Sequence, residues 1–184
     1  SIIGLAISLG LRAEVGTGLD PETGLRAWSW QSPGVSVRLV QRLPDQTRAF
    51  FLARGFDYEA ADRFALSCVF QTIVRNTAAP AAASPLGVDL AEWRLQQHGS
   101  KTPLALAEAW DPVWVEAGQS RAARIAFRWA LFPTRQQFDP GAYNWGMTSF
   151  GLAPSSRLDL HLVWRRAGRK ETGVIEGIEC APDE

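Results

Sequence analysis

Apolar and polar residues alternate along several short segments of the chain, and this period of two predicts strands that bury one face. Within residues 35–42, the side chains of Val35, Val37 and Leu39 share one face, with mostly polar residues between them. Residues 25–30 precede this segment across a serine-proline-glycine turn, which is typical of a β-hairpin connection. The first part of the chain therefore predicts two antiparallel strands that contribute to a core.

The longest alternating pattern covers residues 121–164, where two apolar-polar segments flank an aromatic connection punctuated by glycine and proline. We expect both segments to be strands and the connection at 138–152 to be a loop. The core-facing residues are expected to be Ile125, Phe127, Trp129 and Leu131 in the first strand, and Leu158, Leu160, Leu162 and Trp164 in the second.

Further strands are predicted by short apolar, aromatic or β-branched runs at residues 47–54, 68–75, 88–96 and 173–180. One helix is predicted after Asp57, because aspartate is a favourable N-cap and Glu59 follows in the first turn. Residues 104–110 fit either a short helix or a strand, and Pro112 is expected to end that element.

Roughly eight to ten short strands and one helix predict a mainly β protein, an antiparallel β-sandwich with one short helix. The general architecture resembles an immunoglobulin-like sandwich, although the Cys, Trp, Cys spacing of that fold is absent. Residues 1–184 are interpreted as a single β-sandwich domain with a Pro/Ala-rich surface loop at 76–87. The alternative is that this loop separates two small domains.

The composition supports a folded chain of balanced charge. Of the 184 residues, 46% are hydrophobic and 21% are charged, which gives enough apolar surface for a core. Lysine plus arginine and aspartate plus glutamate each total 19, so the charge excess of a nucleic-acid-binding protein is missing. We therefore expect no nucleic-acid partner.

The two cysteines bear on the cellular compartment. Cys68 and Cys180 each lie in a predicted strand, and we expect a disulfide between them, with two separate buried thiols as the alternative. A disulfide, together with the scarcity of lysine and the alanine-proline loop, suits a periplasmic or secreted bacterial protein. Residues 1–12 are apolar but too short to span a membrane, and they are either a first strand or the end of an anchor upstream of Ser1.

The connection between the two longest predicted strands is the first candidate for a functional site. Aromatic side chains in a loop offer flat contact surfaces, and glycines permit tight bends of the backbone. The alternative is a loop that folds back and seals one end of the sandwich. The candidate ligand-binding residues are Phe138, Tyr143, Trp145, Met147 and Phe150.

A second candidate is a copper or zinc site. It would combine His161 and His98 with Met147 or a cysteine thiolate, and Asp159 is close enough in sequence to orient the His161 imidazole. No short ligand spacing supports this site, and the alternative is that each histidine is an ordinary surface residue.

No motif for catalysis appears in the chain. A GxSxG nucleophile elbow is absent, and so is a glycine-rich phosphate loop, so we name no catalytic residue and expect no enzyme. The preferred hypothesis is an exported, non-catalytic binding or accessory protein that recognises a partner protein or small ligand and needs no cofactor. The alternative is a metal-handling or enzymatic accessory domain that uses His161 and His98.

Overall fold

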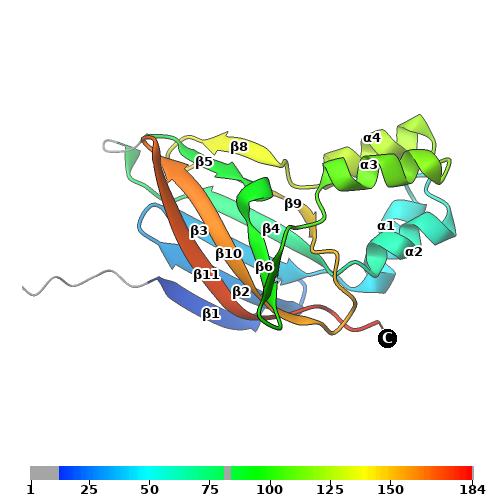
Figure 1. Ribbon diagram of the computed structural model, residues 1–184, viewed down its shortest axis with the longest axis horizontal. Coiled ribbons are helices and arrows are strands. Elements are labelled where there is room, and N and C mark those ends of the chain that lie inside the picture. The colour runs from blue at the N-terminus through cyan, green and yellow to red at the C-terminus, as the bar shows by residue number, and fades with distance from the viewer. Residues whose placement is uncertain (1–12, 81–83, 184) are drawn as a thin grey trace, which may run out of the picture.

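The computed structural model describes residues 13–80 and 84–183, which form a mainly β protein with two antiparallel sheets (Figure 1). The first sheet has the order β1-β2-β3-β4-β9. Its strands are β1 (Glu14–Leu19), β2 (Arg26–Ser32), β3 (Val35–Gln41), β4 (Val69–Asn76) and β9 (Tyr143–Ser149). The predicted hairpin of β2 and β3 and the predicted strand at 68–75 are confirmed.

The second sheet has the order β7-β6-β10-β5-β8, and β11 also pairs with β10. Its strands are β5 (Leu86–Asp89), β6 (Arg94–Gln97), β7 (Ser100–Thr102), β8 (Arg135–Phe138), β10 (Arg157–Arg166) and β11 (Arg169–Glu179). The long β10–β11 hairpin confirms the strands predicted in this part of the chain. The strand predicted at 88–96 is instead two strands, β5 and β6, separated by the short 3-10 helix η2 (Leu90–Glu92).

The two sheets face one another across one apolar core to which both contribute. Trp30 of the first sheet and Trp164 of the second lie in an edge contact, with ring centroids 5.2 Å apart, so the predicted burial of Trp164 is confirmed. Gly173 of β11 makes room for this pair, because a Cβ there would lie 2.3 Å from Trp30 Cζ2. Two facing antiparallel sheets are the layers of a sandwich, whereas the immunoglobulin-like assignment stays a prediction.

Four α-helices occur in the described residues, so the prediction of one short helix was wrong. They are α1 (Pro44–Leu52), α2 (Tyr58–Ala65), α3 (Ala107–Glu116) and α4 (Arg121–Ala130). The first two form the connection between β3 and β4, and the last two lie between β7 and β8. All four gather at one end of the sheets (Figure 1).

Helix α2 is the one that the sequence predicted. The Asp57 side chain is its N-cap and accepts a hydrogen bond of 2.8 Å from the Ala60 amide. The same carboxylate accepts a second hydrogen bond, of 2.5 Å, from Nε2 of Gln119 in the connection between α3 and α4. These two hydrogen bonds lower the pKa of Asp57.

Helix α1 replaces the strand predicted at 47–54. Its first residue is Pro44, which is well suited to this position because its missing amide has no helical partner there. The buried residues Pro44, Thr47 and Phe51 are spaced by three and four positions. That is the spacing of one helical face, which the run of aromatic residues obscured.

Helix α4 replaces the strand predicted from the alternation of residues 125–131. Its buried residues are Ala123 and Phe127, four positions apart, and Ser120 caps its first turn by accepting a hydrogen bond from the Ala123 amide. The same residues therefore satisfy a helical period, and the alanines of the segment favour the helix. As a result, Trp129 is 86% exposed, and its predicted place in the core was wrong.

Residues 107–116 are helical, which decides the alternatives left open for the segment at 104–110 in favour of a helix. The expected break at Pro112 was wrong, since this proline lies inside α3. A proline costs the helix one backbone hydrogen bond, and the burial of Trp114 on the same helix offsets this cost.

A second apolar core joins the helices to the first sheet. Phe51, Phe64 and Phe127 come from three different helices, and their rings lie 4.9 to 5.4 Å apart between centroids. Val69 of β4 and Met147 of β9 complete this core from the sheet. The helices therefore cover one end of the sheet face that points away from the shared core of the two sheets.

The connection at 138–152 is mostly a strand, so its assignment as a loop was wrong. It contains the end of β8, a turn at Gly141 and the edge strand β9. Gly146 lies within β9. A side chain is excluded at this position, because a Cβ would lie 2.4 Å from the backbone nitrogen of Phe132. A glycine that the sequence suggested as a bend is therefore required for close packing of two chain segments.

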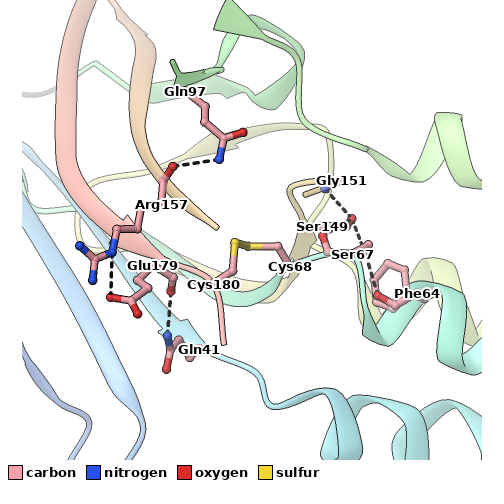
Figure 2. Close-up of a disulfide and its surroundings, with 10 residues drawn as sticks. All are labelled: Gln41, Phe64, Ser67, Cys68, Gln97, Ser149, Gly151, Arg157, Glu179 and Cys180. Atoms are coloured by element: carbon pink, nitrogen blue, oxygen red, sulfur yellow. Dashed lines mark hydrogen bonds and ion pairs between the residues drawn. A yellow bond between two sulfur atoms is a disulfide. The ribbon is translucent and has the colours of Figure 1, made fainter. Parts of the chain in front are cut away.

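The predicted disulfide between Cys68 and Cys180 is confirmed (Figure 2). It joins the residue before β4 in the first sheet to the residue after β11 in the second, with the two Cα atoms 5.2 Å apart. Beside it, Gln41 Nε2 donates a 2.7 Å hydrogen bond to the carbonyl of Glu179, which also links the two sheets (Figure 2).

The proline-rich loop runs between the end of β4 at Asn76 and the start of β5 at Leu86. The strand or anchor expected at residues 1–12 lies outside the described residues. Within residues 13–80 and 84–183, no helix is long and apolar enough to cross a membrane.

Candidate ligand-binding groove

A groove of about 770 Å³ lies where the helices meet the outward-facing side of the first sheet. Phe70 and Val74 of β4 point into the shared core of the sheets, so Gln71 between them points to the opposite side. Gln71 pairs with Met147 of β9, and both line the groove. Helices α1 and α4 supply the facing wall.

Two tryptophans of the groove are unusually exposed. Trp129 of α4 is 86% exposed and Trp145 of β9 is 61% exposed. Five of the eight tryptophans in the chain are buried instead: Trp28, Trp30, Trp93, Trp114 and Trp164. Exposed tryptophan is costly in water but is frequent where a partner or ligand binds. We call this site, with Trp129 and Trp145 on its walls, the tryptophan groove.

The apolar part of the groove continues between these tryptophans. Met147 is buried and belongs to the second core, while Phe50 of α1 is half-buried beside it. Ala126 and Ala130 keep the α4 wall shallow, since they lie on the same side of that helix as Trp129. The groove thus combines broad aromatic walls with a small-residue surface between them.

Two arginines supply the charge of the groove. Arg42 follows β3, and its Nε is buried without a hydrogen-bond partner among the described residues. Burial lowers the pKa of the Arg42 guanidinium, although such a group stays charged at neutral pH. Arg54 follows α1, and its guanidinium lies over the Phe50 ring, 3.3 Å from the ring centroid.

Among the described residues that line the groove, there is no acidic side chain, histidine, serine or cysteine. The groups it presents are guanidinium donors, amides and apolar or aromatic faces. This set of groups is suited to holding an anionic or aromatic ligand. None of these side chains is a type that commonly acts as a nucleophile or a general base. A smaller cavity of about 220 Å³ between α2 and α3 has charged side chains in half of its lining and is less suited to a ring system.

The five candidate residues of the aromatic segment lie in three different surroundings. Phe138 and Phe150 are buried in the shared core, where Phe150 packs against Phe70 with centroids 4.8 Å apart. Tyr143 is 55% exposed on β9 under the guanidinium of Arg75. Trp145 and Met147 both line the tryptophan groove. The sequence pattern therefore locates two residues of the groove.

Trp129, Arg42 and Arg54 are among the groove residues that were not predicted from the sequence. Trp129 was assigned to the core because its segment was interpreted as a strand. The signal that finds it is the helical spacing of Ala123 and Phe127, which turns Trp129 to the surface. Arg42 follows β3 and Arg54 follows α1, and nothing in the residues around them indicates that they meet in one groove.

The two histidines are not brought together. His161 of β10 lies opposite Arg94 of β6, and His98 is four residues further along. Because β6 ends at Gln97, His98 lies in the turn beyond the strand and away from the level of His161 on β10. His98 is exposed in the turn before β7.

The partners proposed for a metal site have other roles. His161 Nε2 lies 2.7 Å from Gln96 Oε1, and Asp159 Oδ1 accepts a hydrogen bond from the Gly177 amide instead of orienting the imidazole. Burial is the main cause that lowers the pKa of His161, and Lys101 adds to this effect. Both cysteines are in the disulfide, and the part of the chain described by the structure holds no cluster of three or more potential ligands.

Comparisons with protein-family models, with curated proteins and with solved structures found no match to this chain.

Proposed function

We propose that this chain is an exported, non-catalytic binding protein that recognises a small ligand in the tryptophan groove. The observation that carries the proposal is the exposure of Trp129 and Trp145 on the walls of one groove, in a chain that buries five of its tryptophans. A volume of about 770 Å³ supports a small-molecule ligand, because such sites commonly measure roughly 300 to 1,000 Å³.

The disulfide supports the exported location. Bridges of this kind persist in oxidising compartments such as the periplasm or the extracellular space. Cys68 and Cys180 are buried and the bridge links both sheets, which is the arrangement of a structural disulfide. We therefore propose that the protein is located in the periplasm or outside the cell.

The experiment is a fluorescence titration with N-phenyl-1-naphthylamine, a neutral aromatic probe that brightens in apolar surroundings. The wild type is expected to bind one equivalent. The double variant Trp129→Ala/Trp145→Ala is expected to lose at least tenfold in affinity, because each indole supplies stacking surface to the probe. The matched control is Tyr58→Ala, which removes another exposed aromatic ring, on α2 and outside the groove.

Circular dichroism establishes that each variant is folded before its affinity is compared. Unchanged affinity in the folded double variant would place the probe elsewhere and overturn the proposed site. The absence of stoichiometric binding to the wild type would overturn it as well.

A further inference from the structure

We propose that the ligand of the tryptophan groove is an aromatic acid, a small molecule with a flat ring system and one carboxylate or sulfonate group. This inference rests on the proposed function and adds the chemical class of the ligand. It is based on the position of Arg42 and Arg54 in the same groove as the exposed tryptophans.

The charge of the groove is unbalanced. Ten ion pairs are found among the described residues, and neither Arg42 nor Arg54 takes part in them. With no acidic side chain in the described lining, the groove carries two positive charges in a chain whose formal net charge is zero. An anion is the complementary ligand for this surface.

Arg42 provides the clearest reason to expect an anion. A partly buried guanidinium normally compensates its lost hydration through hydrogen bonds or an ion pair. No side-chain hydrogen bond of Arg42 is found within the described residues, and its buried Nε is unsatisfied. A carboxylate in the groove would supply the missing acceptor, and bidentate geometry suits a guanidinium.

Arg54 is held in place for a similar role. Its Nη1 donates a 2.9 Å hydrogen bond to the carbonyl of Phe50, and the guanidinium stacks on the Phe50 ring. These contacts use one of its five N–H donors, and no other side-chain hydrogen bond of Arg54 is found within the described residues. Stacking also limits the motion of the arginine side chain, so less conformational entropy is lost when a ligand binds.

The rest of the ligand must match an apolar and aromatic surface. Trp129 and Trp145 contribute exposed indole rings, and Met147 adapts to the shape of an irregular group. A flat ring gains more from these walls than a flexible chain does, because it has fewer rotatable bonds to order. The combination of ring surfaces and unpaired guanidinium groups defines an aromatic acid.

The test uses two probes with the same ring system. One is 8-anilinonaphthalene-1-sulfonate, and the other is the neutral N-phenyl-1-naphthylamine, which lacks the sulfonate. We expect the sulfonate to bind roughly tenfold or more tightly than the neutral probe, the ratio for a hydrogen bond to a charged group. In the variant Arg54→Gln this ratio of affinities is expected to fall severalfold, and in Arg42→Gln to fall further.

The matched control is Arg169→Gln, which removes the same charge from the exposed first residue of β11, outside the groove, and leaves the ratio unchanged. Arg54 is exposed, so its variant keeps the test valid if Arg42→Gln does not fold. Equal affinities for the two probes, with no effect of Arg54→Gln, would overturn the proposal that the ligand is an aromatic acid, but would leave the groove as a binding site. Failure of both probes to bind would overturn the groove itself.

Discussion

The disulfide is expected to contribute a large share of the stability of this protein. Replacing Cys68 and Cys180 by alanine removes a cross-link between residues 112 positions apart. In the chain-entropy model, a closed loop of this length lowers the entropy of the unfolded chain by about 16 cal/mol/K, which corresponds to about 4.8 kcal/mol at 25 °C. The bridge stabilises the fold mainly by restricting the unfolded state.

The expected change in melting temperature follows from the size of the chain. An unfolding entropy of about 2.1 cal/mol/K per residue over 184 residues gives a total of about 390 cal/mol/K. A loss of about 4.8 kcal/mol therefore lowers Tm by about 12 °C. The measurement is thermal unfolding followed by circular dichroism.

The control separates the cross-link from the packing of the sulfur atoms. Fully reduced wild type keeps both buried thiols and loses only the bond, so the difference between oxidised and reduced wild type reports the cross-link. The difference between reduced wild type and Cys68→Ala/Cys180→Ala reports the lost sulfur contacts. A Tm difference below about 4 °C between the oxidised and reduced forms would refute the argument from loop length.

Three further predictions concern single residues. Gly173→Ala should destabilise the fold by about 1 to 3 kcal/mol in urea unfolding, since its Cβ would meet the Trp30 ring, whereas Gly16→Ala, with nothing within 4 Å, should have at most a small effect. Asp57→Ala should lower Tm by about 2 to 4 °C through loss of the α2 N-cap, and Asp57→Asn should retain most of the wild-type Tm. Because the pKa of His161 is lowered in the folded state, its contribution to stability is complete above the ordinary imidazole pKa of about 6.5 and is lost as pH falls through the folded pKa. His161→Gln should therefore reduce the fall in Tm measured between pH 7.5 and 5, and an unchanged pH dependence would contradict this origin.

Strands were predictable from the sequence where the alternation of apolar and polar residues fits a strand and not a helix. The hairpin of β2 and β3 alternates and is joined by turn-forming residues, and β10 alternates from Arg157 to Leu162. The N-cap of α2 and the disulfide also follow from local residue types and from the count of cysteines. In each case, local preference and tertiary packing favour the same structure.

The helices α1 and α4 were missed because their residues satisfy two periods. Aromatic residues at alternate positions favour a strand, while Ala123 and Phe127 are also spaced as one face of a helix. Contact with the other helices, through the second core, favours the helical form. The same error hid Trp129 from the candidate site, although Trp145 and Met147 were found from the aromatic segment itself.

Indole N–H resonances give the most direct test of the tryptophan groove. The chain has eight tryptophans, and substitution of each by phenylalanine assigns its Nε1–H signal in a proton-nitrogen correlation spectrum. On addition of 8-anilinonaphthalene-1-sulfonate, the groove predicts large, saturable shifts for Trp129 and Trp145 and much smaller ones for the buried Trp28 and Trp93. Saturable binding that leaves the signals of Trp129 and Trp145 unmoved would contradict the account.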